Sequence, residues 1–285
     1  MKKNNKFFVK FWGVRGSIAC SDPKVAKYGG NTSCVEIRCG NEVFIFDSGT
    51  GIRYLGNELV KEDINNFRIL YSHTHYDHIC GLPFFSPAFN PKNKIEFFSG
   101  HLKPKNNIKN VLSSIMKEPV WPVGLDIFPC SMNFTDFFAG ENLVFSDDIQ
   151  IKTCPLNHEN GATGYRINFY DKSICYITDT NHIPGEPDRN IIRLIEGANI
   201  VIYDSMFTEE EFKDRQHWGH STWEQGAKLC DLADAERLCI FHHDPSHEDS
   251  FMDKIAIEAE TNPHLLPIML IIFAANIVDI AIPIT

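Results

Sequence analysis

The chain has 285 residues, enough to bury a large hydrophobic core in one domain or in two small ones. Its 27 Lys and Arg against 37 Asp and Glu give a formal net charge of −10. This charge disfavours non-specific binding to long polyanions, although it is compatible with a local basic patch. The nine cysteines lie mainly in apolar runs and none are spaced as CxxC, so we expect a reducing, cytoplasmic environment without a disulfide framework.

Neither end of the chain is expected to enter a membrane. Residues 1–6 lack the apolar stretch of a signal peptide and are expected to be disordered. The apolar stretch from Leu265 to Ile284 is about long enough to cross a bilayer, but it contains two prolines and Asp279. We therefore predict two terminal strands of the core there, the last at residues 277–282, rather than an anchor.

The first part of the chain alternates strand and helix signals. Apolar runs bounded by turn residues predict strands at 7–12, 34–39, 43–46 and 67–70. Helical periodicity predicts helices at 52–62 and 106–116, and a further helix is expected to begin within 79–82. Asp47 follows the third strand, where its carboxylate can either orient a metal-bound histidine or cap the next helix; the sequence leaves both roles open.

The second part repeats this rhythm without a low-complexity linker. Strands are predicted at 149–154, 164–169, 173–177, 200–203 and 238–241, with helices at 187–195 and 222–234. Two strand-rich halves with interleaved helices predict an α/β fold, a four-layer αββα sandwich of mixed sheets, in a single domain over residues 1–285. Residues 100–148 include a stretch rich in proline and aromatic residues at 119–129, which is either a lid or wall over the site or an edge loop packed on the helix at 106–116.

Residue types that bind metals are concentrated at positions 73–78. His73, His75, Asp77 and His78 follow a short apolar strand. Residues two apart in an extended segment point to the same side, so His73 and His75 can converge on one ion. The chain must then turn, which directs Asp77 and His78 towards a second ion nearby. Imidazole and carboxylate ligands favour zinc, with cobalt, iron and manganese as alternatives.

The H-x-H-x-D-H pattern of these residues is the signature of the metallo-β-lactamase superfamily, and the chain resembles this superfamily. The resemblance implies the same αββα sandwich and three further ligands at long separations. Residues of the required types, His158, Asp179 and His242, each stand just past a predicted strand. His242 and His243 cannot be distinguished by their chemistry, and His242 is chosen because it matches the position of the ligand in the superfamily.

The resemblance therefore implies a site for two divalent ions with seven ligands. One ion is assigned to His73, His75 and His158, and the other to Asp77, His78 and His242. Asp179 is expected to bridge the two ions. Asp77 is also expected to take part in catalysis.

A second motif, at residues 218–224, narrows the chemistry. Ser221 and Glu224 fit a capping box, which places His220 just before a helix, where anionic groups bind readily. The G-H-S-T stretch at 219–222 resembles the phosphodiesterase branch of the superfamily, to which ribonuclease Z and the cyclic phosphodiesterases belong. This resemblance implies that His220 donates a proton to the leaving group. The alternative is a surface histidine on a loop.

These assignments predict a metal-dependent hydrolase. Two ions about 3.5–4 Å apart can hold a hydroxide between them, which attacks the substrate while the ions polarise the bond. We expect a phosphodiesterase for a small substrate, cyclic phosphodiesters included. Ribonuclease Z carries a long basic arm that binds tRNA, and this sequence shows no such arm, so nucleic acid and tRNA 3′-processing form the weaker alternative. Sulfate esters, lactones and thioesters are further alternatives, a non-enzymatic sensor fits least, and a homodimer is left open.

Overall fold

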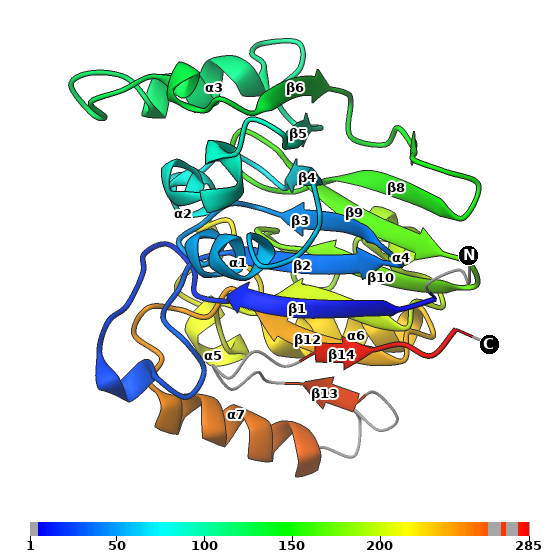
Figure 1. The fold of residues 1–285 in the computed structure, drawn as a ribbon. Coiled ribbons are helices and arrows are strands. Elements are labelled where there is room, and N and C mark those ends of the chain that lie inside the picture. Colours follow the sequence, from blue (N-terminus) through cyan, green and yellow to red (C-terminus); the bar gives the residue numbers. More distant parts are fainter. Residues whose placement is uncertain (1–4, 262–268, 272–278, 285) are drawn as a thin grey trace.

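The computed structural model describes residues 5–261, 269–271 and 279–284 (Figure 1). Residues 1–4, 262–268 and 272–278 lie outside the described residues. The disorder expected for the first six residues falls largely on the first of these ranges, and the two terminal strands expected after residue 265 fall largely on the other two. Two short strands are described in the C-terminal stretch, β13 (Met269–Ile271) and β14 (Asp279–Ala281). No helix within the described ranges combines the length and the apolar character needed to span a bilayer.

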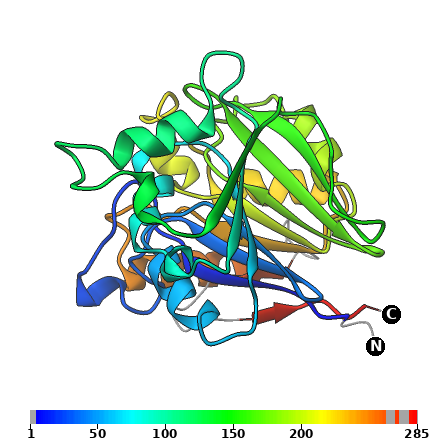
Figure 2. The same cartoon turned by 45° about the horizontal axis from the view of Figure 1, so that its top comes forward.

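Two seven-stranded sheets form the framework, and Figures 1 and 2 show them facing each other. The first sheet has, in spatial order, β14, β1 (Phe7–Gly13), β2 (Cys34–Cys39), β3 (Glu42–Phe46), β4 (Asn66–Tyr71), β5 (Lys94–Ser99) and β6 (Ser131–Asp136). The second has β13, β12 (Arg237–Phe241), β11 (Ile200–Asp204), β10 (Lys172–Ile177), β9 (Ala162–Phe169), β8 (Ile149–Leu156) and β7 (Leu143–Val144). In each sheet antiparallel pairs at one side meet parallel pairs at the other, so both sheets are mixed, as expected.

The core is layered because side chains alternate between the two faces of each strand. In β11, Ile200 and Ile202 point into the cluster between the sheets, whereas Val201 and Tyr203 pack under the outer helices. The central strands are accordingly continuous apolar runs rather than alternating ones, as expected for strands covered on both faces.

Seven α-helices lie around the sheets. They are α1 (Ile52–Leu59), α2 (Tyr76–Ile79), α3 (Ile108–Ile115), α4 (Arg189–Ile195), α5 (Glu209–Phe212), α6 (Trp223–Leu232) and α7 (Asp249–Thr261) among the described residues. Helices α1 and α3 cover the outer face of the first sheet, and α4, α6 and α7 cover that of the second. The α/β, four-layer αββα expectation is therefore confirmed.

Three local predictions need correction. The helix expected to begin within 79–82 is α2, which begins at Tyr76 and so contains Asp77 and His78; the carboxylate in its first turn complements the helix dipole. Strands β5, β6 and β7 had no predicted counterpart; β6 is a polar edge strand whose residues are all exposed or half-buried, whereas the largely buried β5 was missed. The cap of α6 is Thr222, whose hydroxyl accepts from the Gln225 amide, and not Ser221.

The segment 100–148 contributes α3, β6 and β7, so part of it belongs to the sheets. The stretch after α3 projects from the body in Figures 1 and 2. Its aromatic rings pack on the loop that follows α2: Trp121 meets Phe84 edge-on at 5.5 Å between ring centroids, and Phe128 meets Phe89 at 5.1 Å. A role as a lid stays a prediction.

Candidate metal centre

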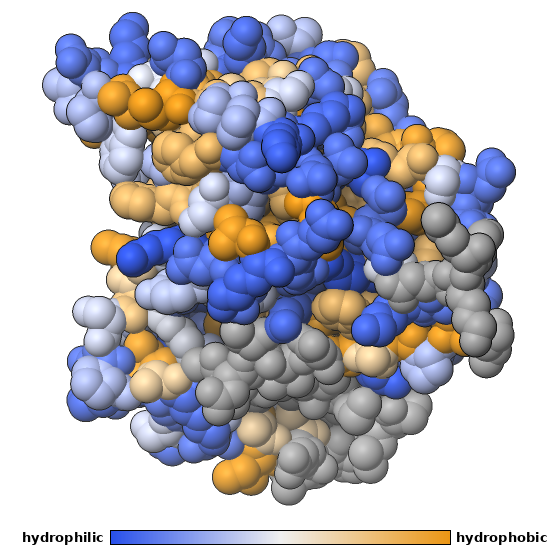
Figure 3. All heavy atoms as spheres, in the orientation of Figure 1, coloured by the Kyte–Doolittle hydropathy of each residue, from blue (hydrophilic) through white to orange (hydrophobic). Residues whose placement is uncertain are grey.

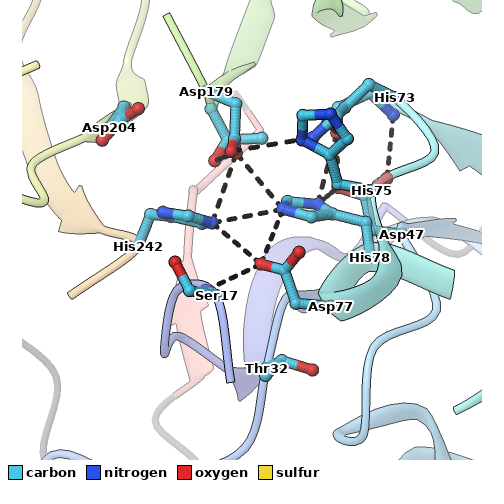
Figure 4. A network of polar contacts seen from close by, with 12 residues as sticks. Ser17, Thr32, Asp47, His73, His75, Asp77, His78, Asp179, Asp204 and His242 are labelled. Atoms are coloured by element: carbon cyan, nitrogen blue, oxygen red, sulfur yellow. Dashed lines mark hydrogen bonds and ion pairs between the residues drawn. The ribbon is translucent and has the colours of Figure 1, made fainter. Parts of the chain in front are cut away.

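The predicted metal ligands lie at one edge of the two sheets, in loops and one short helix that follow the ends of strands. His73 and His75 follow β4, and Asp77 and His78 follow in α2. His158, Asp179 and His242 follow β8, β10 and β12 of the opposite sheet. Figure 4 shows most of these side chains converging on one centre. Carboxyl ends of parallel strands are the usual position of binding sites in open α/β sheets.

The first group contains three histidines. The ring nitrogens His158 Nε2 and His75 Nδ1 lie 3.1 Å apart, and His73 faces both rings edge-on. His73 Nε2 is buried without a hydrogen-bond partner. Burial lowers the pKa of His73, and the neighbouring His78 lowers it further, so this imidazole is neutral and offers a lone pair.

The second group contains Asp77, His78 and His242. His78 Nε2 lies 3.2 Å from His242 Nε2, and Asp77 Oδ2 lies 3.3 Å from each of these nitrogens. Burial raises the pKa of Asp77, but the adjacent His78 and His242 outweigh it and hold that pKa well below its usual range. The donors of Asp77, His78 and His242 lie within 4.8 Å of one another, whereas the His243 backbone pairs with the loop around Arg15; the structure brings His242, and not His243, into the group.

Asp179 stands between the two groups. Its Oδ1 lies 3.7 Å from His73 Nε2 and 3.9 Å from His158 Nε2. Its Oδ2 lies 3.3 Å from His78 Nε2 and 3.4 Å from His242 Nε2. Each oxygen thus faces one group, which is the arrangement that a bridging carboxylate requires.

The donor set fits two divalent cations. Ring nitrogens and carboxylate oxygens from residues far apart in sequence lie within 4.8 Å of one another in overlapping groups, and the orphaned Nε2 of His73 points into the first. The second nitrogens of the rings are held by the protein: His78 Nδ1 donates to Asp47 Oδ2 at 2.8 Å, and His158 Nδ1 donates to the Gly219 carbonyl at 2.8 Å. Such contacts fix the tautomer and orientation of a metal-bound histidine.

Asp47 orients His78 and does not cap α1, so the structure decides between the two roles left open. Its carboxylate also accepts from the Ser72 amide at 2.8 Å and from the Tyr176 hydroxyl at 2.7 Å. Helix α1 begins after Gly51, without a side-chain cap. Asp47, Asp179 and His242 all have φ of 54–62°, the left-handed region that non-glycine residues rarely occupy. Strain of this kind concentrates at functional sites.

His220 lies beside the second group, stacked on the His242 ring at 4.9 Å, and is only 9% exposed. Its Nδ1 donates to Asp204 Oδ2 at 3.0 Å. Burial lowers the pKa of His220, but the Asp204 carboxylate outweighs burial and raises that pKa to about 9. A ring nitrogen of His220 also lies within 4.8 Å of donors on Asp179 and His242, so the geometry alone is compatible with a ligand role as well.

Sequence reasoning missed three contributors. The Ser17 amide donates to Asp77 Oδ2 at 2.8 Å, and Gly16 packs so closely that an added Cβ would lie 2.5 Å from His242 Nδ1. His101, at the end of the unpredicted β5, has its ring 6.5 Å from that of His73. The two glycines on either side of Arg15, Gly13 and Gly16, were the available signal for the turn that brings Ser17 to the site. Nothing in the sequence pointed to His101.

Paired sheets with this donor set at their shared edge define a metal-dependent member of the metallo-β-lactamase fold. The sequence profile of the family described as "Beta-lactamase superfamily domain" matches residues 44–243, more than half of the chain. The chain therefore belongs to the β-lactamase superfamily.

Relatives and solved structures agree with this. The chain is 23% identical over 282 residues to a protein named ribonuclease Z from Picrophilus torridus, covering 85% of this chain and 87% of that one. Among solved structures, the metallo-β-lactamase fold protein YhfI from Bacillus subtilis superposes with a TM-score of 0.70 at 14% identity, covering 96% of this chain and 99% of that one. The short form of human tRNase Z superposes with a TM-score of 0.68 at 18% identity, covering 97% and 100%. These likenesses to structures establish the fold.

Proposed function

We propose that the protein is a binuclear metal-dependent phosphodiesterase that acts on a small phosphodiester. The observation that carries this proposal is the arrangement of seven donors in two groups that share Asp179, with His220 directly beside them. Relatives named ribonuclease Z, and a structural neighbour described as a diphosphatase from the PhnP family with a TM-score of 0.66, support phosphoester chemistry.

The first ion would be held by His73, His75 and His158, the second by Asp77, His78 and His242, with Asp179 reaching both. We propose zinc, which suits imidazole and carboxylate donors. When bound, two such ions supply a nucleophile from water near neutral pH and neutralise charge on the phosphoryl oxygens.

His220 supplies the proton that the leaving oxygen needs. Its Nδ1–H stays bound to Asp204, which leaves Nε2–H as the proton to donate, and the raised pKa keeps the ring protonated at neutral pH. Asp204 is itself held by the amides of Thr180 at 3.1 Å and Met206 at 3.2 Å, so it is a positioning residue on a rigid support.

The charge around the site favours a small substrate over a long polyanion. The loops that carry the donors (residues 14–18, 72–81, 157–161, 178–187, 213–222 and 242–247) contain three cationic side chains of Lys or Arg type, Arg15, Lys213 and Arg215, and Lys213 forms an ion pair with Glu210. Arg15 is fully buried and donates to the carbonyls of Gly29, Asp244 and His247. Binding of a polyanion relies on several Lys and Arg contacts to phosphates.

The second candidate is tRNA 3′-processing, which the relatives named ribonuclease Z favour. It differs from the first in the substrate and not in the metal chemistry. A tRNA precursor with a 3′ trailer, compared with small phosphodiesters by kcat/KM, separates the two. A preference for the precursor by several orders of magnitude would replace the first proposal with the second.

Metal analysis coupled to turnover tests the proposal. The purified protein is expected to bind about two transition-metal ions per chain and to hydrolyse bis(p-nitrophenyl) phosphate. A chelator should abolish the activity, and zinc or manganese should restore it. Absence of bound metal, with no gain on adding either ion, overturns the binuclear assignment. Faster turnover of a sulfate ester, lactone or thioester in a matched panel overturns the phosphodiester assignment alone.

A further inference from the structure

Large apolar side chains are exposed on the same loops that carry the site. Ile18 follows Ser17, Tyr76 stands between His75 and Asp77, Ile183 follows Asp179 by four residues, and Trp218 precedes His220 by two. Their exposed fractions are 63%, 67%, 52% and 63% respectively. Figure 3 shows hydrophobic residues in orange along the left edge of the molecule, the side on which α2 lies in Figure 1; on its scale tyrosine and tryptophan count as weakly hydrophilic, so the orange surface does not include Tyr76 or Trp218. Exposed apolar groups gathered around a site indicate a surface that binds something.

Trp218 is fixed in place by the residues on either side of it. Its amide donates to the Arg215 carbonyl at 3.0 Å. Gly219 has φ of +82°, and an added Cβ there would lie 2.6 Å from His158 Nδ1, so only glycine fits between Trp218 and the site. The Gly219 carbonyl accepts from that same nitrogen of His158. The backbone that carries Trp218 is therefore in direct contact with a proposed metal ligand.

The indole ring and the His220 ring also share a packing partner, Phe207. The ring of Phe207, which is buried, lies 6.3 Å from the Trp218 ring and 6.1 Å from the His220 ring, and so packs near both. The Arg215 guanidinium lies 5.8 Å from the Trp218 ring and 5.2 Å from that of Phe207. The rest of the indole is open to solvent, two residues before the histidine that is proposed to protonate the leaving group.

We propose that Trp218 is a stacking platform for a flat aromatic group of the substrate, of the nucleobase class. An indole presents a broad, rigid surface whose π-face stacks on any base, and stacking of this kind needs no hydrogen-bond readout. Arg215 behind the ring adds a cation to the same wall. This inference rests on the proposed phosphodiesterase function and names its substrate class: a small phosphodiester that carries a nucleobase beside the scissile bond.

The test compares two cyclic phosphodiesters that differ in the base. Adenosine 2′,3′-cyclic phosphate has one, and glycerol 1,2-cyclic phosphate has none. With the metal-loaded protein, Trp218→Ala should lower kcat/KM for the adenosine substrate by about 5- to 150-fold, mainly through KM, and should change the glycerol substrate less than about twofold. Trp218→Phe should retain most of the preference. Tyr170→Ala is the matched control, because it removes an exposed aromatic side chain in the hairpin between β9 and β10, at the opposite end of β10 from Asp179.

A binding measurement separates this inference from the proposed function. Adenosine 5′-monophosphate should bind the wild-type protein more tightly than ribose 5-phosphate does, and Trp218→Ala should remove the difference. An unchanged preference for the base in Trp218→Ala, in binding or in kcat/KM, overturns the stacking role while phosphodiester turnover stands. Loss of turnover of both cyclic substrates in Trp218→Ala, with its metals and melting temperature unchanged, also overturns it. Absence of wild-type turnover of any phosphodiester counts against the proposed function, and the two binding constants still decide the role of Trp218.

Discussion

Replacing His220 by alanine separates its role in chemistry from a role in metal binding. The ring donates to Asp204 through Nδ1 and stacks on His242, so Nε2 is the only position left for a proton to leave from. A general acid contributes about 10²–10⁴ in rate, and at about 1.36 kcal/mol per factor of ten this is roughly 2.7–5.4 kcal/mol of activation free energy. That loss is expected in full only for a leaving group that departs poorly without a proton, such as a sugar hydroxyl.

The assay uses two substrates on one variant. A p-nitrophenolate leaves without a proton, so His220→Ala should cost less than about tenfold on bis(p-nitrophenyl) phosphate and the full factor on a nucleoside cyclic phosphate. Metal content should match that of the wild type. His217→Ala is the control, because His217 is an exposed histidine of the same loop. Equal rate losses on both substrates with metals intact refute the general-acid role, and loss of metal identifies His220 as a ligand instead.

Three further predictions concern the surrounding residues. Asp179→Ala should deplete both ions, because the two carboxylate oxygens of Asp179 face different donor groups, whereas His158→Ala should mainly empty one site. Equal and mild loss of metal in both variants, measured by elemental analysis, would contradict a bridging role for Asp179. Asp204→Asn removes the carboxylate that contributes most to raising the pKa of His220, so this pKa should fall. The alkaline limb of the pH–rate profile should then move to lower pH, and an unmoved limb would show that Asp204 does not set the pKa of His220. Glu224→Gln should raise the melting temperature at pH 8 but not at pH 4, because burial and then Glu209 raise the pKa of Glu224 to about 7 from 4.5. The folded state therefore prefers protonated Glu224, and the stability of the wild type declines as pH rises from 4.5 to about 7. A difference in melting temperature between variant and wild type that stays constant across pH would show that the Glu224 carboxyl does not cause this decline.

The positions of the proposed donors could be predicted because each group follows a recognisable strand; His73 to His78 also form a pattern with fixed spacing, whereas His158, Asp179 and His242 were chosen through the resemblance. His73 to His78 are local, and β4 before them is an apolar run. Asp179 and His242 likewise follow buried strands, and the structure places both at the same edge. The family profile confirms the superfamily that these motifs indicated.

Contacts that depend on the third dimension could not be predicted in this way. Nothing local in the sequence indicates that the Asp204 carboxylate, at the end of β11, meets His220 on another loop. The Ser17 amide reaches Asp77 across 60 positions. The capping prediction for α6 was wrong by one residue, because the Ser221 hydroxyl is already bonded to His182 and Tyr203. Tertiary partners outweighed the local pattern at that helix end.

The division of the donors between the two sheets has a consequence for how the protein matures. The nitrogens of His75 and His158 meet across 83 positions of sequence, and Asp77 meets His242 across 165. Closing such long loops costs conformational entropy before any contact repays it, so neither site can exist until both halves have folded and docked. We therefore expect metal capture to accompany or follow the docking of the two halves. Each ion would act as a cross-link between the halves that resists their separation only after synthesis of the whole chain.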